Sequence, residues 1–179
     1  MGQGLSHSLA ASPHAEICMP MDDPSFLSRV TRPIPNHYLD SSRALLRQAI
    51  DIVEALAELI SSAEPRATII SCSFGKDRTG IVVGLMLRII GVNVHHISRD
   101  YALSARQLRP HLQRFRMHWE KRGISAQEFA IRFETQARTM SMLLGALPHQ
   151  LLLESHPQGC QPEFVDLLRN RMVRGRPSL

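Results

Sequence analysis

At 179 residues and 20.1 kDa, the chain is long enough for one domain with a substantial apolar core and too short for several. Its net charge of +5 is carried almost entirely by arginine and favours anionic partners, without separating phosphorylated substrates from nucleic acid. Three widely spaced cysteines argue against a disulfide scaffold and a zinc site, and no apolar run reaches the ~20 residues of a membrane-spanning helix.

Residues 1–35 are predicted to form an irregular N-terminal segment. The first thirteen residues are small and polar without periodicity, and residues 15–19 fit one short strand before Pro20. Prolines at positions 33 and 35 are incompatible with a regular helix across them. The terminus has no basic segment followed by an apolar run, so the expected location is the cytoplasm.

Residues 36–175 are predicted to form one domain that begins with a helix and a buried strand. Apolar residues recur at helical spacing from 41 to 62, at Leu45, Ala49, Val53, Leu56 and Ile60. Residues 67–71 form a short β-branched run between Pro65 and Gly75, which favours a buried strand.

A second helix is predicted from 79 to 90, because this stretch is apolar apart from Arg88 and is followed by Gly91, a natural C-cap residue. Further helices are predicted at 94–105, 107–122, 126–144 and 162–173. The sequence Ser125-Ala-Gln-Glu128 is a capping box at the start of the third of these. The pattern predicts an α/β fold, predominantly helical, with a strand, loop and helix at its centre and a short parallel sheet.

The loop between the predicted strand and helix reads Cys-Ser-Phe-Gly-Lys-Asp-Arg-Thr-Gly over residues 72–80. Five residues between Cys72 and Arg78 let the backbone curl so that its N–H groups surround an anion. The positive end of the following helix and the Arg78 guanidinium also favour phosphate there. The residues expected to line the bound phosphate are Ser73, Phe74, Gly75, Lys76 and Gly80.

The same positive field should lower the pKa of Cys72 below the ~8.5 of a free thiol, which makes it a thiolate at neutral pH. A thiolate can attack phosphorus in line while the amides and Arg78 stabilise the phosphoryl oxygens. Thr79 is placed to orient the thiolate or the water of the second step. No metal or organic cofactor is required.

The leaving oxygen needs a proton, and Asp77 is the candidate donor within the loop. Four other aspartates become candidates if folding brings them over the pocket: Asp22, Asp23, Asp40 and Asp100. Lys76 is expected to add a second cation at the rim of the loop, which would favour substrates with extra negative charge.

The loop and its flanks resemble the bacterial tyrosine/serine protein phosphatases, whose signature is His-Cys-x-x-Gly-Lys-Asp-Arg-Thr-Gly. The similarity continues through the apolar helix into Asp100-Tyr-Ala-Leu103. By this resemblance Cys72 is the nucleophile, Arg78 binds phosphate, and Asp77 is the loop aspartate considered as the general acid. The downstream helical region, about 94–155, would contribute a lid. Lys76 resembles the loop lysine of lipid-active relatives of the phosphatase-and-tensin type. Phosphorylated lipids are therefore candidate substrates, as are phosphoproteins and small phosphorylated metabolites.

Two features differ from that family. Ser71 stands where the family has histidine, which predicts weaker stabilisation of the thiolate and reduced activity. Residues 1–40 do not resemble the family's long N-terminal region with its further strands. The resemblance covers about residues 36–173, which predicts a fragment, a truncated product or a chain that completes its sheet with a partner, because a lone central strand leaves buried backbone groups unpaired.

Other functions also fit the sequence. One is a phosphatase-like module that binds a phosphorylated ligand without hydrolysing it. Another is nucleic-acid or lipid-headgroup binding by the basic stretch around Phe115 and Trp119, although a solvated helix face is favoured there. Metal binding is disfavoured, because the adjacent His95 and His96 face different directions on a helix.

Overall fold

In the computed structural model, the residues described are 51–53, 55–56, 59–60, 68–145 and 162–173. The described residues between 51 and 60 are helical, in agreement with the predicted helix over 41–62. The predicted strand at 15–19 lies outside the described residues, as do the candidate acids Asp22, Asp23 and Asp40.

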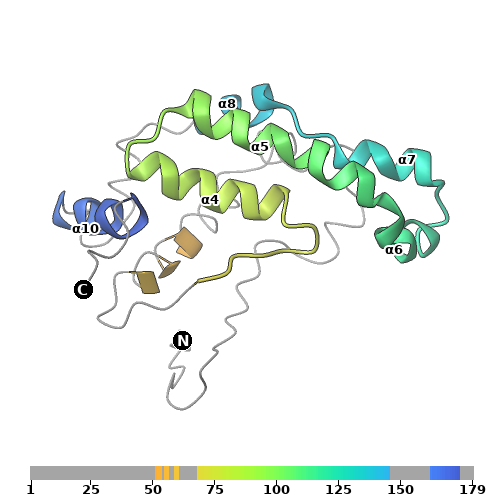
Figure 1. Cartoon of the computed structure of the whole chain (residues 1–179), viewed down its shortest axis with the longest axis horizontal. Helices are drawn as coiled ribbons and strands as arrows, with labels where there is room; N and C mark the ends of the chain where they lie inside the picture. Colours follow the sequence, from red (N-terminus) through yellow and green to blue (C-terminus); the bar gives the residue numbers. More distant parts are fainter. Residues whose placement is uncertain (1–50, 54, 57–58, 61–67, 146–161, 174–179) are drawn as a thin grey trace, which may run out of the picture.

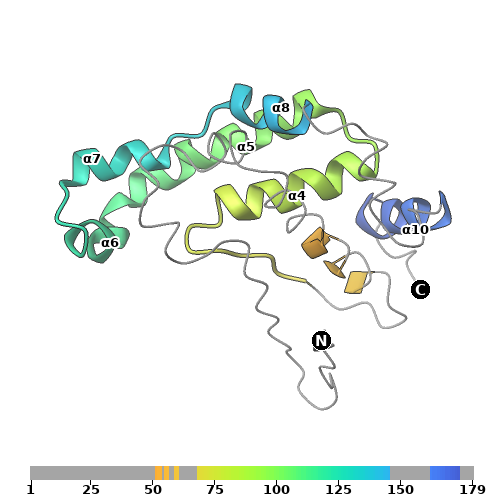
Figure 2. The ribbon, with the colours of Figure 1, turned by 180° about the vertical axis from the view of Figure 1, so that it is seen from behind.

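Eight helical elements follow along the described chain: α4 (Asp77–Ile89), α5 (Val94–Leu108), η1 (Arg109–Phe115), α6 (Arg116–Glu120), α7 (Ala126–Ala130), η2 (Ile131–Phe133), α8 (Ala137–Gly145) and α10 (Pro162–Val173). Helices α4 and α5 run side by side, and α8 packs on α5 (Figures 1 and 2). The short helices α6 and α7 lie near the end of α5, while α10 lies beyond the opposite end of α4. None of these helices is both long and apolar enough to cross a bilayer.

The buried strand predicted for 67–71 is wrong for the four residues of it that the structure describes. Residues 68–71 have no regular secondary structure, and the Ile69 side chain is 90% exposed. A strand needs a neighbour for its ladder of hydrogen bonds, and no described segment pairs with this one. The predominantly helical character of the prediction is confirmed, whereas the described residues contain no sheet.

Helix α4 begins at Asp77, two residues earlier than predicted. It ends at Ile89, just before Gly91, the glycine that the sequence predicted as its C-cap. Gly91 has a φ of 92°, and the N–H of Val92 donates to the carbonyl of Leu87 at 2.9 Å. A positive φ is costly for residues with a Cβ, so glycine at this position ends the helix cleanly.

The long helices predicted at 107–122 and 126–144 are each interrupted. Pro110 stands in the first turn of η1, where its missing N–H ends the α-helical hydrogen bonding of α5. The predicted capping box is confirmed, because the Ser125 hydroxyl accepts from the Glu128 N–H at 3.1 Å and the Glu128 carboxylate accepts from the Ser125 N–H at 2.7 Å. The helix that it opens stops at η2, and residues 134–136 form an irregular connection before α8.

The main apolar core lies between α4, α5, α8 and α10. Gly80 and Gly84 let α4 approach its neighbours closely, since a Cβ on Gly80 would lie 2.9 Å from the Tyr101 ring and one on Gly84 would lie 3.3 Å from Ile97. Helix α8 contributes Met140, Leu143 and Leu144 to this core, all fully buried, whereas Met142 on its other face is exposed.

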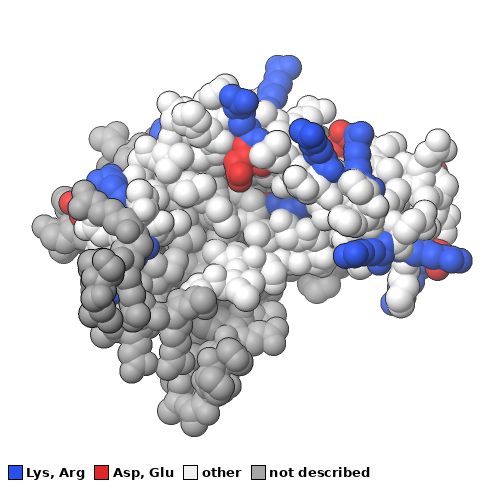
Figure 3. Space-filling view, in the orientation of Figure 1, with Lys and Arg blue, Asp and Glu red and all other residues white. Residues whose placement is uncertain are grey.

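The basic stretch of η1 and α6 is a solvated surface. Its arginines and lysine are exposed and project from this end of the molecule (Figure 3). Several make local contacts: Arg109 pairs with Glu134, Arg116 pairs with Glu120, and Arg122 donates to the His118 carbonyl. This arrangement agrees with the favoured interpretation of a solvated helix face.

Ser98→Ala is expected to be neutral or to stabilise the fold by about 1 kcal/mol. Ser98 is 3% exposed, and among the described residues its hydroxyl has no hydrogen-bond partner. Removing an unsatisfied buried hydroxyl from a helix recovers its desolvation cost, and alanine is the better helix former. Urea unfolding would measure the effect, and a clear loss of stability would show that the hydroxyl has a partner.

Candidate active site

The loop over residues 72–80 connects the irregular stretch 68–71 to α4. Residues 73–76 form consecutive bends, and Gly75 has a φ of 60°. A Cβ on Gly75 would meet no atom within 4 Å, so the loop requires glycine there for its backbone conformation rather than for space.

Cys72 is half-buried and carries a free thiol. Burial alone would raise the pKa of Cys72. Hydrogen bonding with the Thr79 hydroxyl and with the backbone amides of Thr79, Phe74 and Lys76 lowers the pKa by more than burial raises it. The net pKa of the thiol is therefore below its ordinary value. This direction is the one expected for a nucleophilic cysteine, and it arises without a histidine at position 71.

Arg78 and Thr79 both lie in the first turn of α4, directly after Asp77. An Nη2 donor of Arg78 reaches the Ser73 hydroxyl at 3.4 Å, which directs the guanidinium back across the loop. The Thr79 hydroxyl is buried, and it is the side chain whose hydrogen bonding helps to lower the pKa of Cys72.

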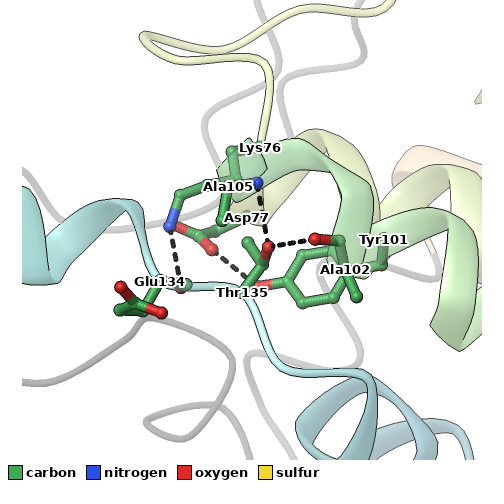
Figure 4. A network of polar contacts seen from close by, with 7 residues as sticks. All are labelled: Lys76, Asp77, Tyr101, Ala102, Ala105, Glu134 and Thr135. Atoms are coloured by element: carbon green, nitrogen blue, oxygen red, sulfur yellow. Dashed lines mark hydrogen bonds and ion pairs between the residues drawn. The ribbon is translucent and has the colours of Figure 1, made fainter. Parts of the chain in front are cut away.

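Lys76 and Asp77 are buried beneath the loop, so the expectation that Lys76 adds a cation at the rim is wrong. The Lys76 side chain is 1% exposed, and its ammonium lies 3.0 Å from Asp77 Oδ2 and 3.4 Å from the Glu134 carbonyl (Figure 4). Asp77 is 5% exposed and accepts a hydrogen bond of 2.8 Å from the Tyr101 hydroxyl. The lysine charge is neutralised internally.

The pKa values of the buried pair Asp77 and Tyr101 are both raised. Burial raises the pKa of Asp77 more than Lys76, Tyr101 and Arg78 together lower it. Burial and the neighbouring Asp77 raise the pKa of Tyr101, which therefore remains a hydrogen-bond donor at all ordinary pH values.

Phe74 holds the loop against an aromatic cluster that the sequence did not predict. Its ring centroid lies 5.0 Å from Phe115, 5.1 Å from His118 and 5.6 Å from Phe133. Phe74 was predicted as a phosphate-lining residue. Its half-buried side chain packs on this cluster and also lines a cavity beside the loop, while its backbone N–H contributes to the lowered pKa of Cys72.

Two adjoining cavities border the loop beside α5. One, of about 140 Å³, runs along the crevice between α4 and α5, and the other, of about 380 Å³, extends from Phe74 to Leu108. Gly75, Asp100 and Ser104 line both. Asp100 is exposed, and it is the candidate acid outside the loop that the described fold brings to the edge of the loop.

Comparison with known proteins agrees with the resemblance of the loop. Residues 22–151 match the tyrosine phosphatase family. The chain is also similar to a tyrosine-protein phosphatase of Nostoc commune, with 43% identity over 49 residues, which cover 27% of this chain and 17% of that protein. No solved structure matches. Because the family match covers more than half of the chain and includes the loop of Cys72, this protein belongs to the tyrosine phosphatase family.

Proposed function

We propose that the chain hydrolyses phosphate monoesters through a phosphocysteine intermediate, with Cys72 as nucleophile and Arg78 as the phosphate-binding cation. The observation that carries this proposal is the lowered pKa of a half-buried Cys72, which arises from hydrogen bonding to the loop amides and the Thr79 hydroxyl. Amides that stabilise a thiolate are equally suited to stabilise phosphoryl oxygens, and family membership implies phosphorylated substrates.

In the first step, the Cys72 thiolate forms an S–P bond as the P–O bond to the leaving group breaks, and the leaving oxygen takes up a proton. In the second step, water attacks phosphorus, the P–S bond breaks, and inorganic phosphate leaves with regeneration of the thiolate. The Thr79 hydroxyl stabilises the thiolate that enters the first step and departs in the second, while Arg78 holds two phosphoryl oxygens throughout.

Phosphotyrosine in proteins is the first substrate to test, because the Nostoc relative bears the name of a tyrosine-protein phosphatase. Phosphoserine, phosphorylated lipids and small phosphorylated metabolites are the further candidates. The buried Lys76–Asp77 pair removes the lysine as a reason to prefer multiply charged substrates.

The proposal is tested by trapping the intermediate. The purified chain is mixed with p-nitrophenyl phosphate without added metal, quenched in acid and digested, and the peptide that contains Cys72 is examined for bound phosphate. Phosphate on Cys72 together with steady release of nitrophenol is expected. Turnover with phosphate on another residue, or turnover that requires a metal, would contradict the mechanism.

A second function, phosphate binding without turnover, is favoured by one observation. The stretch that leads into the loop is exposed, with Ile69 at 90%, and no described strand supports it. Protection of Cys72 from alkylation by inorganic phosphate, in a folded protein that releases no nitrophenol, would identify such a binding module.

A further inference from the structure

A buried polar network connects the phosphate loop to two other segments of the protein (Figure 4). Asp77, the first residue of α4, accepts from the Tyr101 hydroxyl of α5 at 2.8 Å and pairs with Lys76 at 3.0 Å. The Lys76 ammonium donates to the carbonyl of Glu134. The next residue, Thr135, donates to the carbonyl of Ala102 and accepts from the N–H of Ala105, both at 3.0 Å.

We propose that Asp77 and Tyr101 are positioning residues, which hold the loop in its anion-binding shape, and that Asp77 is not the proton donor to the leaving group. This inference rests on the proposed phosphatase function. A proton donor must reach the leaving oxygen, which departs on the side of phosphorus opposite Cys72. Asp77 is 5% exposed, and its two carboxylate oxygens are engaged by Tyr101 and Lys76.

The position of Asp77 explains how it controls the loop. The amides of its neighbours Lys76 and Thr79 are among the groups that lower the pKa of Cys72, so fixing Asp77 fixes those amides. Tyr101 is itself held tightly, because its ring packs against Gly80, where a Cβ would lie 2.9 Å from the ring. The last glycine of the loop thus admits the tyrosine that anchors Asp77.

The groups around Asp77 allow an experiment to distinguish proton donation by Asp77 from positioning of the loop by Asp77. The charged and titratable groups that act on it are Lys76, Arg78 and Tyr101. The Tyr101 hydroxyl lowers the pKa of Asp77, so its removal would raise that pKa further. If Asp77 donated the proton, Tyr101→Phe would move the alkaline limb of the rate profile to higher pH. If Asp77 only positions the loop, that limb stays in place and the titration of Cys72 moves instead.

The first experiment measures the rate of alkylation of Cys72 by iodoacetamide against pH, resolved by peptide mass spectrometry, in the wild type, Tyr101→Phe and Ser98→Ala. Ser98→Ala is the matched control, because it also removes a buried hydroxyl from α5. The Ser98 hydroxyl has no hydrogen-bond partner among the described residues. Tyr101→Phe is expected to raise the pKa of Cys72 by about one unit and to lower kcat/KM by about tenfold, with Ser98→Ala unchanged. An unchanged Cys72 titration in folded Tyr101→Phe would overturn the proposal.

The second experiment compares Asp77→Asn with the wild type on p-nitrophenyl phosphate and phenyl phosphate, whose leaving groups differ in basicity. Asparagine keeps an acceptor for Tyr101 but cannot donate a carboxyl proton. A positioning role predicts the same fold-loss on both substrates. A loss that is much larger for phenyl phosphate would show that Asp77 is the donor. The alkylation experiment does not need turnover, so it tests the positioning role even if the wild type is inactive. An inactive wild type would count against the proposed function alone.

Discussion

Cys72→Ser is expected to lower kcat for p-nitrophenyl phosphate by at least about a thousandfold. Serine has nearly the same shape, but its hydroxyl is far less acidic than a thiol. The amides and Thr79 that lower the pKa of Cys72 cannot ionise a serine at neutral pH. Because Arg78 and the loop backbone are unaltered, binding of inorganic phosphate should persist in the variant.

The controls for this prediction use the other two cysteines. Cys18→Ser and Cys160→Ser each remove a thiol outside residues 72–80 and should retain the wild-type rate. Circular dichroism would establish that each variant is folded. Full activity in a folded Cys72→Ser protein would eliminate the phosphocysteine mechanism.

Lys76→Met is expected to reduce the free energy of unfolding by about 3–5 kcal/mol near neutral pH. The side chains of Lys76 and Asp77 are 1% and 7% exposed, so removal of the lysine leaves a buried carboxylate without its counter-charge. The double variant Lys76→Met/Asp77→Asn should recover much of the loss, because it removes the charge and keeps an acceptor for Tyr101. Urea unfolding of the single and double variants would measure the coupling.

The exposed pair Arg116–Glu120 provides the matched control, since its side chains are 69% and 50% exposed. Arg116→Met should cost less than about 1 kcal/mol, because solvent screens such a pair. If Lys76→Met costs no more than Arg116→Met, the buried pair does not hold the loop to the fold.

The pH dependence of Lys76→Met has a defined sign. Burial raises the pKa of Asp77, and loss of the lysine, which lowers it, would raise the pKa further. The folded variant then binds a proton more tightly than the unfolded chain, so its stability falls as pH rises from the ordinary aspartate pKa of 3.8 to the raised value. The deficit relative to the wild type should narrow as the pH is lowered toward 4. A deficit that is independent of pH would contradict an ionised, unpaired Asp77 as its cause.

Sequence signals that act within a few residues predicted part of the local structure, whereas the strand predicted at 67–71 is absent from the described residues. The glycine after α4, the Ser125–Glu128 capping box and the run of residues 72–80 each depend on backbone conformation or on hydrogen bonds within a few residues. These interactions are encoded by neighbours in the chain, so they can be identified without knowing the fold. The family was identifiable for the same reason, because the signature is a contiguous loop.

The placement of the side chains was decided by tertiary structure alone. Lys76 meets Glu134 across 58 positions and Asp77 meets Tyr101 across 24, and no sequence period reports such contacts. Spacing within the loop indicated that a phosphate fits among the amides, but it could not show which charged loop residues face the phosphate and which face the core. That choice depends on what packs beneath the loop: the hydroxyl of Tyr101 and the carbonyl of Glu134 make burial of the lysine–aspartate pair favourable.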